Sequence, residues 1–258
     1  MAIHLYPYKF GLESCERLRD KLQELNGGQK IWQISIESSK VTAEDTVFTW
    51  GCSTPGTWNA RRVINPSRSI RKAVDKLLTF ELLSEAGVSH VPYTRYKQIA
   101  EEWLENGDTV FCRGQTRGFD GAGISIIRPG SDLIHANLYT KMLPSTQEYR
   151  CYVYGNQAFA SRNKVFNAAE IKEDAHPEEF RDVIRTTSNG WVFSTNVVDI
   201  LPEYTNLAVQ AVRALGLTFG GVDVLVSNHR PFILEVNTAP WLSELLAGRL
   251  ATRIWNDV

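Results

Sequence analysis

The sequence lacks long apolar runs and an excess of either charge, and each absence excludes a class of protein. Its apolar runs are short throughout 258 residues, whereas a membrane-spanning helix needs about 20 consecutive apolar residues. The first ten residues contain no such stretch either, so we expect no signal peptide. A formal net charge of −1 provides no overall field that would attract nucleic acid or an anionic membrane.

Clustered cysteines and spaced histidines, the usual signs of a metal site, are also missing. The four cysteines stand far apart without a CxxC pair, and the five histidines show neither metal-ligand spacing nor a nucleophile beside them. We therefore expect reduced structural thiols in a cytoplasmic protein, with a disulfide or a reactive thiol as the alternatives. A composition of 43% hydrophobic and 22% charged residues is that of an ordinary globular protein.

Residue spacing along the chain predicts an α+β protein built in lobes. Apolar residues recur at helical spacing over Leu12–Leu25, between short strands at residues 31–36 and 46–50, which predicts a small α/β lobe over residues 1–68. One helix is predicted at residues 70–86, and others at 99–105, 174–184, 202–215 and 242–255. Strands separated by turns are predicted at residues 109–113, 123–127, 138–143, 148–154, 157–161, 221–226 and 231–236.

Residues 219–240 predict a β-hairpin that carries two acids. Alternate valines place Asp223 on the opposite face from the apolar side chains, while Glu235 and Asn237 are two residues apart and share a face. A hairpin symmetric about His229 puts Asp223 directly opposite Glu235. Facing carboxylates repel unless a cation lies between them. The hairpin therefore predicts a metal site, with a solvent-facing polar strand pair as the alternative.

The three oxygen ligands of this hairpin suit a hard divalent cation. Mg²⁺ prefers oxygen donors and retains positions for phosphate oxygens and water, and Mn²⁺ is the alternative. The sequence thus predicts a magnesium site at Asp223, Glu235 and Asn237.

A glycine-rich segment at residues 113–123 separates two predicted strands. Glycines allow backbone N–H groups to wrap a phosphate, and Arg113 and Arg117 supply charge that pairs with phosphate oxygens. The segment lacks the P-loop pattern, and no helix follows it. A phosphate-binding loop and a plain flexible turn are both compatible with it.

Taken in order, these motifs resemble the ATP-grasp superfamily, in particular the RimK-type glutamate ligases and the short ATP-grasp proteins of phages. The resemblance runs from about residue 69 to residue 241. It implies an ATP-grasp fold, in which two α+β lobes grip ATP, here residues 69–140 and 141–258, after the α/β lobe of residues 1–68. The most specific match is the stretch GGVDVLVSNHRPFILEVNTAP, where Asp223, Glu235 and Asn237 fall on the family's metal ligands.

The resemblance also implies nucleotide and substrate contacts. Arg113 stands where the family usually has lysine, and Lys141 stands in the adenine-binding segment where an acid is usual. Arg150 and Lys164 correspond to catalytic basic residues that meet phosphate or substrate. The implied nucleotide-binding residues are Lys76, Arg113, Gly118, Gly121, Gly123, Lys141, Met142, Leu143 and Asn196.

Several of these residues also have a purely structural interpretation. Lys76 could be an ordinary exposed helix lysine, Arg150 could pair with Glu148 or another surface acid, and Lys164 could be solvated. The aromatic side chains of Trp191 and Phe193 are more typical of a core than of a ligand contact.

The family's chemistry implies an ATP- and Mg²⁺-dependent ligase that joins a carboxylate substrate to an amine substrate through an acyl-phosphate. The amine or carboxylate would belong to an amino acid, a peptide or a protein end. The alternatives are a small-molecule kinase of the same fold and a nucleotide-binding regulator that has lost catalysis. The sequence leaves open both substrates and the oligomeric state, a homodimer included.

Overall fold

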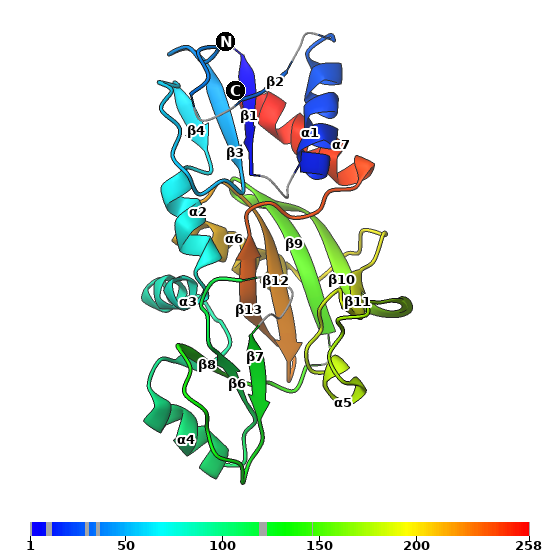
Figure 1. The fold of residues 1–258 in the computed structure, drawn as a ribbon. Helices are drawn as coiled ribbons and strands as arrows, with labels where there is room; N and C mark the ends of the chain where they lie inside the picture. Colours follow the sequence, from blue (N-terminus) through cyan, green and yellow to red (C-terminus); the bar gives the residue numbers. More distant parts are fainter. Residues whose placement is uncertain are drawn as a thin grey trace.

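The computed structural model describes residues 2–8, 12–28, 31–34, 37–118, 123–145 and 147–257, and it arranges them around three β-sheets (Figure 1). The sheets follow one another along the molecule, with both chain ends at the same end (Figure 1). The fold is mixed α and β, as the sequence predicts.

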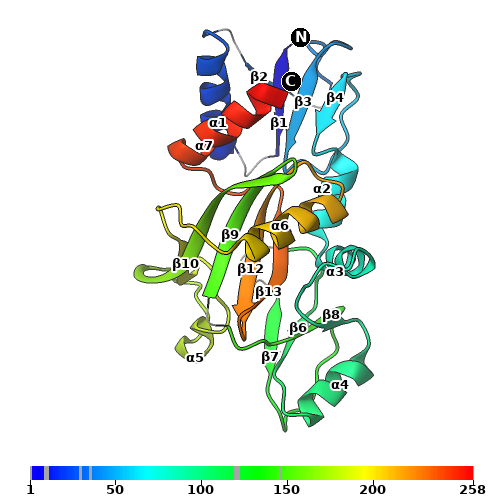
Figure 2. The same ribbon diagram turned by 180° about the vertical axis from the view of Figure 1, so that it is seen from behind.

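The N-terminal sheet is parallel, with strand order β2-β1-β3-β4. Helix α1 (Leu12–Leu25) buries Cys15, Leu18 and Leu22 in the core of this lobe. The last helix, α7 (Glu244–Asp257), returns from the far end of the chain and packs against α1 (Figure 2). The strands are β1 (Ile3–Pro7), β2 (Trp32–Gln33), β3 (Thr46–Trp50) and β4 (Arg62–Ile64).

A small antiparallel sheet, ordered β5-β8-β6-β7, forms the opposite end of the molecule. Helix α4 (Lys97–Glu105) packs on it through Ala100 and Leu104. Its strands are β5 (Tyr93–Thr94), β6 (Val110–Arg113), β7 (Ile124–Ile127) and β8 (Leu138–Lys141).

The central antiparallel sheet, ordered β11-β10-β9-β12-β13, lies between the other two (Figures 1 and 2). Helix α6 (Pro202–Ala214) covers one face and shares the largest core with the valines of β12. The short helix α5 (Glu178–Arg181) precedes β11. The strands are β9 (Gln147–Tyr154), β10 (Gln157–Ile171), β11 (Asn189–Phe193), β12 (Phe219–Ser227) and β13 (Arg230–Asn237).

Strand β10 is much longer than the predicted segment of residues 157–161. Its second half, residues 164–171, is largely exposed and mixes apolar and polar residues in no regular order, so the alternation that reveals a half-buried strand is missing there. It is nevertheless paired, because β11 continues the sheet antiparallel to it, from Lys164 opposite Phe193 to Ile171 opposite Asn189. The sequence did not predict β11.

The single helix predicted at residues 70–86 is wrong, since the chain forms two helices there. Helix α2 (Ser67–Val74) ends at Asp75, whose backbone is extended, and α3 (Lys76–Glu85) begins immediately afterwards. The Asp75 carboxylate accepts a hydrogen bond from Leu78 N–H at 3.3 Å, which is the usual role of an aspartate that caps a helix. The break places Lys76 at the start of a helix rather than in its middle.

The predicted hairpin is confirmed, but its register arises differently. Asn228 and His229 have φ values of 48° and 61°, as in a two-residue hairpin turn, and Ser227 pairs with Arg230. Regular pairing from that turn would put Asp223 opposite Leu234. A β-bulge next to Asp223 shifts the register by one residue and brings Asp223 opposite Glu235.

Two further features concern the chain as a whole. Among the described residues, none of the helices combines the length and apolarity that a bilayer crossing requires.

The domain boundaries at residues 68/69 and 140/141 stay a prediction. The sequence placed α7 in the second ATP-grasp lobe, but α7 packs on the N-terminal lobe.

Candidate active site

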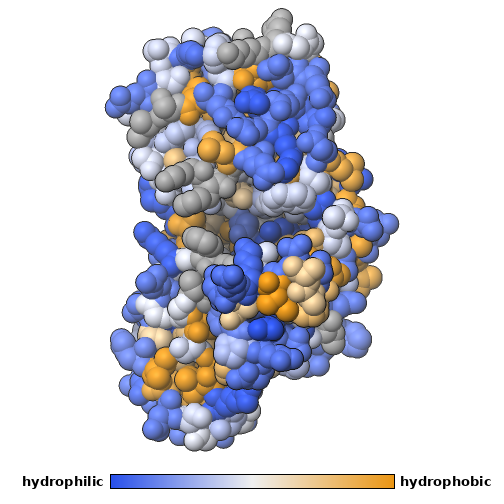
Figure 3. Space-filling view, turned by 45° about the vertical axis from the view of Figure 1, so that its right-hand side comes forward, coloured by the Kyte–Doolittle hydropathy of each residue, from blue (hydrophilic) through white to orange (hydrophobic). Residues whose placement is uncertain are grey.

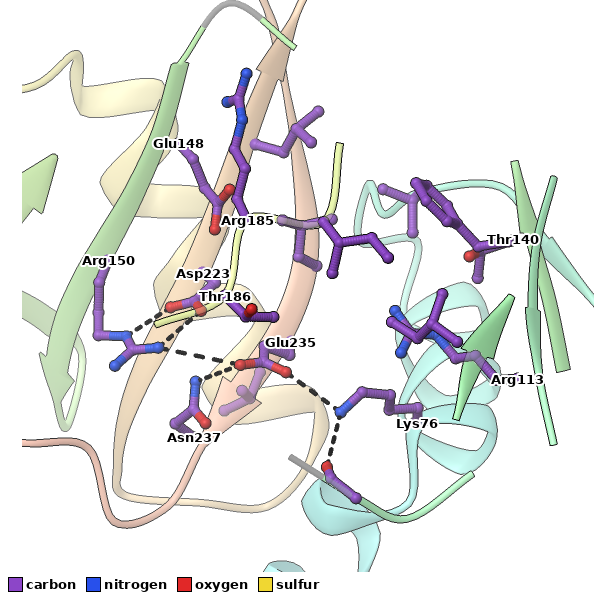
Figure 4. Close-up of a pocket in the computed structure, with 18 of the residues that line it drawn as sticks. Lys76, Arg113, Thr140, Glu148, Arg150, Arg185, Thr186, Asp223, Glu235 and Asn237 are labelled. Atoms are coloured by element: carbon purple, nitrogen blue, oxygen red, sulfur yellow. Dashed lines mark hydrogen bonds and ion pairs between the residues drawn. The ribbon is translucent and has the colours of Figure 1, made fainter. Parts of the chain in front are cut away.

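A cavity of about 770 Å³ lies between the central sheet and the small sheet, within the usual size range of ligand sites. The space-filling view shows a hollow below the N-terminal lobe (Figure 3). Residues from β6, β9, β12, β13 and the start of α3 point into the cavity (Figure 4). The cavity brings together eleven of the predicted site residues, namely Lys76, Arg113, Gly118, Lys141, Met142, Leu143, Arg150, Lys164, Asp223, Glu235 and Asn237.

A row of four charged residues crosses the central sheet. Arg162 of β10 pairs with Arg150 of β9, Arg150 pairs with Asp223 of β12, and Asp223 pairs with Glu235 of β13. Directly opposed residues in a sheet project from the same face, so all four side chains belong to the face that carries the cavity. The row therefore runs from two cations on one side to two carboxylates on the other.

Asp223 is buried and forms a two-pronged ion pair with Arg150. The Nε and Nη2 atoms of Arg150 donate to its carboxylate oxygens at 2.6 and 2.8 Å (Figure 4), the geometry in which a guanidinium binds a carboxylate most strongly. Burial raises the pKa of Asp223 to about 6, and the charge of Arg150 opposes that rise. The same carboxylate raises the pKa of Arg150 above its usual value, although burial alone would lower it.

Glu235 contacts two cations and an amide. Lys76 Nζ lies 3.3 Å from one carboxylate oxygen, and Asn237 Nδ2 donates to the other at 3.0 Å (Figure 4). Arg150 Nη2 is 4.0 Å away. Burial alone would raise the pKa of Glu235, but the charges of Lys76 and Arg150 outweigh burial and hold the pKa well below its usual range. Lys76 therefore has a specific partner and is not an ordinary exposed lysine.

Arg113 faces this acidic group from β6, on the opposite wall of the cavity (Figure 4). Its Nε atom is buried and has no hydrogen-bond partner among the residues that the structure describes. Burial lowers the pKa of Arg113, and Glu235 opposes that shift. An incompletely paired, buried guanidinium favours the approach of an anion, which fits the phosphate contact predicted for this position.

The segment from β8 to β9 forms one end of the cavity. Lys141 and Met142 already use their N–H groups, which donate to Pro92 O and Thr109 O, both at 2.9 Å. The Lys141 ammonium forms an ion pair with Asp108. Leu143 comes next, and within the described part of the chain its N–H group has no hydrogen-bond acceptor. Of the three predicted adenine contacts, Leu143 has the available donor.

Lys164 is largely buried, with 10% of its side chain exposed, and forms an ion pair with Glu148; its ammonium lies 5.0 Å from the centre of the Phe193 ring. The guanidinium of Arg150 lies 4.2 Å from the same ring. The structural interpretations of these two cations are therefore wrong: Lys164 is not solvated, and Arg150 pairs with Asp223 rather than with Glu148. Phe193 lines the cavity, so the expectation that it belongs to a core is also wrong.

Two predicted nucleotide-binding residues do not line the cavity, and a third is not among the described residues. Asn196 does not line it, and its backbone carbonyl accepts a hydrogen bond from Ser194 Oγ at 3.0 Å. Gly123 has φ +72° at the start of β7 and does not line the cavity either. Gly121 lies outside the described residues.

The cavity also contains residues that the sequence did not predict. Arg185, Thr186 and Thr187 enter it from the loop before β11, and Arg185 lies 4.6 Å from the ring of Trp191. Tyr8 and Gly51 line it from the N-terminal lobe. Sequence spacing could not reveal them, because they come from loops that are distant along the chain and approach the site only in the folded protein.

The side chains of β12 and β13 that would hold the predicted metal all offer oxygen atoms. The described residues contain no group of three or more His, Cys, Asp or Glu side chains that could hold a metal ion. Asp223, Glu235 and Asn237 provide two carboxylates and one amide instead, and the first two are directly opposed. An oxygen-only set of this kind fits Mg²⁺ when phosphate oxygens supply further ligands.

Comparison with protein families decides which fold this is. Residues 145–250 match the sequence profile of the RimK-like ATP-grasp domain. This stretch of the chain is therefore similar to the RimK-like ATP-grasp domain. A probable alpha-L-glutamate ligase of Pseudomonas entomophila (strain L48) is 29% identical over 205 residues, which cover 72% of this chain and 63% of that relative. The chain thus spans less than two thirds of that relative's length.

Solved structures show that the ATP-grasp fold extends over the whole chain. The ATP-grasp ligase PsnB, in complex with a minimal precursor, superposes with a TM-score of 0.69 at 14% identity, covering 100% of this chain and 99% of that chain. The D-alanine–D-alanine ligase of Bacillus anthracis superposes with a TM-score of 0.64 at 11% identity, covering 100% and 99%. At these identities the likeness shows the fold alone.

Proposed function

We propose that this ATP-grasp protein is an ATP-dependent ligase that joins a carboxylate to an amine. The observation that carries the proposal is the group of Asp223, Glu235 and Asn237, which faces the incompletely paired Arg113 across one cavity. Oxygen ligands for a divalent cation and a guanidinium for phosphate are the two parts that a site for a metal–nucleotide complex requires. The names of the relatives, which are ligases, support the same activity.

The nucleotide base would lie at the β8–β9 end of the cavity. The N–H group of Leu143 is the available donor there, and Ile124 and Leu234 contribute apolar surface to the cavity lining. The phosphates would then extend toward Arg113, Lys76 and Arg150. Each of these cations lies within reach of Glu235 or Asp223, so the phosphates would enter a region where charges of both signs are already arranged.

Mg²⁺ bound by Asp223, Glu235 and Asn237 would neutralise phosphate charge. The protein's own contribution is to position the reactants and screen charge, which accounts for most of the catalysis in phosphoryl transfer. Arg150 holds Asp223 in place through its two-pronged ion pair. Lys164, fixed by Glu148 and Phe193, would add a positive charge near the sugar and phosphates.

The proposed reaction has two steps. An oxygen of the substrate carboxylate attacks the γ-phosphorus, the bond to the β-phosphate oxygen breaks, and ADP and an acyl-phosphate form. The amine then attacks the acyl carbon, phosphate leaves with the bonding electron pair, and the amine loses a proton. No nucleophilic side chain is needed for this sequence. The cavity walls would limit the access of water to the acyl-phosphate.

Removal of Glu235 provides the test. We expect Glu235→Ala to lower ADP release by at least about 100-fold, since metal-mediated charge stabilisation contributes several kcal/mol. The matched control is Glu244→Ala, which removes an exposed acid on α7. ADP release would be measured with ATP, Mg²⁺ and a peptide ending in glutamate, with L-glutamate as the first amine. Full activity of the Glu235 variant would refute the metal site.

The same assay separates the two alternative functions. A stable phosphorylated product without amide formation would indicate a small-molecule kinase. Tight nucleotide binding without ADP release would indicate a regulator. One observation favours the regulator as the second candidate: Arg150 and Lys76 form ion pairs with the two carboxylates that would hold the metal.

A further inference from the structure

Lys76 joins the start of α3 to one of the predicted metal ligands. Its side chain points toward β13, where its Nζ atom lies 3.3 Å from Glu235 Oε2 (Figure 4). The carbonyl oxygen of Gly118 lies 3.4 Å from the same nitrogen. The other carboxylate oxygen, Glu235 Oε1, accepts a hydrogen bond from Asn237 Nδ2 at 3.0 Å. Both oxygens of Glu235 are therefore bound by donors of the protein.

The charges around Asp223 and Glu235 balance one another. Among the described residues, Arg150 forms the ion pair with Asp223, and Lys76 forms the closest ion pair with Glu235. Two carboxylates and two cations sum to no net charge, whereas the same group without the Lys76 ammonium would carry one negative charge. A divalent cation gains little Coulomb energy from a neutral group and more from a negative one. Lys76 thus opposes the binding of a metal ion by these carboxylates.

The two cations differ in how firmly they are held. Arg150 lies directly opposite Asp223 in the sheet, contacts it through two nitrogen atoms, and has its guanidinium 4.2 Å from the centre of the Phe193 ring. Among the described residues, Lys76 has one ionic partner, and a lysine has a flexible four-carbon stem. The backbone of Lys76 is fixed, because its N–H group donates to Thr116 O at 2.8 Å. The ammonium of Lys76 can therefore change partners while its backbone stays in place.

A phosphate group in the cavity is the anion that would take Lys76 from Glu235. Lys76 and Arg113 both line the cavity, and a phosphate with more than one negative charge attracts a lysine ammonium more strongly than a single carboxylate does. Movement of Lys76 would free Glu235 Oε2 and leave the two acids with a net negative charge. The phosphate oxygens would in addition be ligands that Mg²⁺ prefers. The nucleotide would therefore prepare the metal site as well as complete it.

We propose that Lys76 makes metal binding depend on the nucleotide. Its ammonium holds Glu235 until a nucleotide phosphate binds the ammonium instead, and Glu235 then becomes available to a divalent cation. Lys76 is a positioning residue in this role, because it acts through Glu235 and not on the reacting groups. The inference rests on the nucleotide site of the proposed function and requires neither the carboxylate nor the amine substrate. It predicts that free metal ions bind poorly and that metal and nucleotide strengthen each other's binding by the same factor.

The test measures equilibrium binding to the full-length protein, so that it does not depend on turnover. Electron paramagnetic resonance gives the affinity for Mn²⁺ alone, from the loss of the free-ion signal. Calorimetry gives the affinity for ADP with a chelator and with saturating Mg²⁺, and the ratio of these two affinities is the metal–nucleotide coupling. We expect Lys76→Met to bind Mn²⁺ alone about 10- to 100-fold more tightly than the wild type, the usual effect of a charged hydrogen bond. The coupling should fall by a similar factor, because both changes report the same ion pair.

Three further variants separate this role from a loss of structure. Lys76→Gln removes the charge but keeps a donor for Gly118 O, and it should repeat the result of Lys76→Met, which provides a readout if the latter does not fold. Lys76→Arg keeps the charge and should retain weak Mn²⁺ binding and most of the coupling. The matched control is Lys141→Met, because Lys141 lines the same cavity but pairs with Asp108. It should leave both the affinity for Mn²⁺ alone and the coupling unchanged.

Three results would overturn the inference: binding of Mn²⁺ alone to the wild type as tightly as to Lys76→Met, unchanged coupling in both neutral Lys76 variants, or the same changes in Lys141→Met. Absence of ADP binding would refute it together with the nucleotide site. Failure of the ligase function would look different, because the coupling would then depend on Lys76 while ADP release would be absent with every carboxylate and amine. A ligase whose coupling is the same with and without the Lys76 ammonium would retain the proposed function and refute only this inference.

Discussion

Two buried aspartates, one beside the N-terminal sheet and one in the central sheet, differ in the direction of their pKa shifts. Asp45 and Asp223 are 5% and 3% exposed. Burial favours the neutral acid at both sites, yet the pKa of Asp45 falls to about 2 while that of Asp223 rises to about 6. Similar solvent exposure thus accompanies opposite pKa shifts, because Asp223 lies deeper in the protein and has fewer hydrogen-bond donors around it.

The carboxylate of Asp45 accepts hydrogen bonds from several backbone and side-chain donors of the N-terminal lobe. It accepts hydrogen bonds from Ala2 N–H at 2.6 Å and from Thr42 N–H and Oγ, both at 2.9 Å, and lies 3.2 Å from His4 Nε2. These donors outweigh the cost of burial and lower the pKa of the carboxyl. The charge of Asp45 is therefore part of what holds the N-terminal lobe together.

Within the described part of the chain, Asp223 has one ion-pair partner, Arg150, and it faces a second carboxylate across the hairpin. One guanidinium does not compensate for burial, so the pKa rises. Its charge depends on this one guanidinium rather than on several fixed donors, so a cation brought by a ligand would stabilise it further. The comparison teaches that burial does not distinguish a structural acid from a functional one, whereas the number of fixed donors does.

The largest effect expected from this comparison concerns activity. Asp223→Asn should lower ADP release by at least about 100-fold, because it removes a charge needed to hold the metal–nucleotide complex. Asp45→Asn should leave kcat within about twofold at a temperature where it is folded, because Asp45 lies outside the cavity. Equal losses of activity in the two variants would contradict the distinction between the two acids.

The next effect concerns stability and its dependence on pH. The pKa of Asp45 falls from 3.8 to about 2 on folding, so its charge stabilises the folded state above about pH 4, and that contribution is lost as the pH falls toward 2. The shift corresponds to about 2 kcal/mol. Asp45→Asn should therefore lose about 2 kcal/mol at pH 6 and be less sensitive to acid than the wild type between pH 5 and 2.

Hydrogen exchange of the amides in β1 and β3 measures this locally. The matched control is Asp20→Asn, an exposed acid on α1, which should leave both the protection and its pH dependence unchanged. If Asp45→Asn kept the acid sensitivity of the wild type, the assignment of that sensitivity to Asp45 would be wrong.

The smallest effect is expected where the N-terminal lobe meets the cavity. Gly51 has φ +66°, and an added Cβ would lie 2.7 Å from Ala239 Cβ. Gly28 has φ +82° and nothing within 4 Å of an added Cβ. Gly28→Ala should cost only backbone strain, about 1 kcal/mol, whereas Gly51→Ala adds a steric clash and should cost about 2 kcal/mol. Thermal unfolding of both variants measures the difference between the two losses of stability. Equal losses would mean that the contact between Gly51 and Ala239 does not contribute to stability.

The hairpin shows both the reach and the limit of sequence reasoning. Alternation of apolar and polar residues predicted the strands, and the pairing of Asp223 with Glu235 is confirmed. A hairpin symmetric about His229 predicts this pairing, but the protein reaches it in another way. The two-residue turn alone would pair Asp223 with Leu234, and the β-bulge then shifts the register by one residue. No residue preference identifies that bulge. It forms where the packing of β13 and the backbone hydrogen bonds together favour it.

The glycine-rich segment and Asn196 mark another limit. Glycine content and a position in a familiar order suggested phosphate contacts, but Gly123 and Asn196 do not line the cavity. Arg185 and Tyr8 do line it, although nothing in the residues around them indicates a site. Contacts between distant loops depend on how the lobes pack, which local spacing does not encode.

The sequence by itself determined the elements whose signal is local: amphipathic α1, the valine-rich β12 and the two acids of the hairpin. Periodic burial and alternation act over a few residues and are therefore visible in the order of amino acids. Only the tertiary structure decided which charges meet. Lys76 reaches Glu235 because Asp75 interrupts a helix, and Arg162 is buried without a counter-charge because β10 lies beside β9. Electrostatic energy depends on distance and burial, and both are properties of the folded chain.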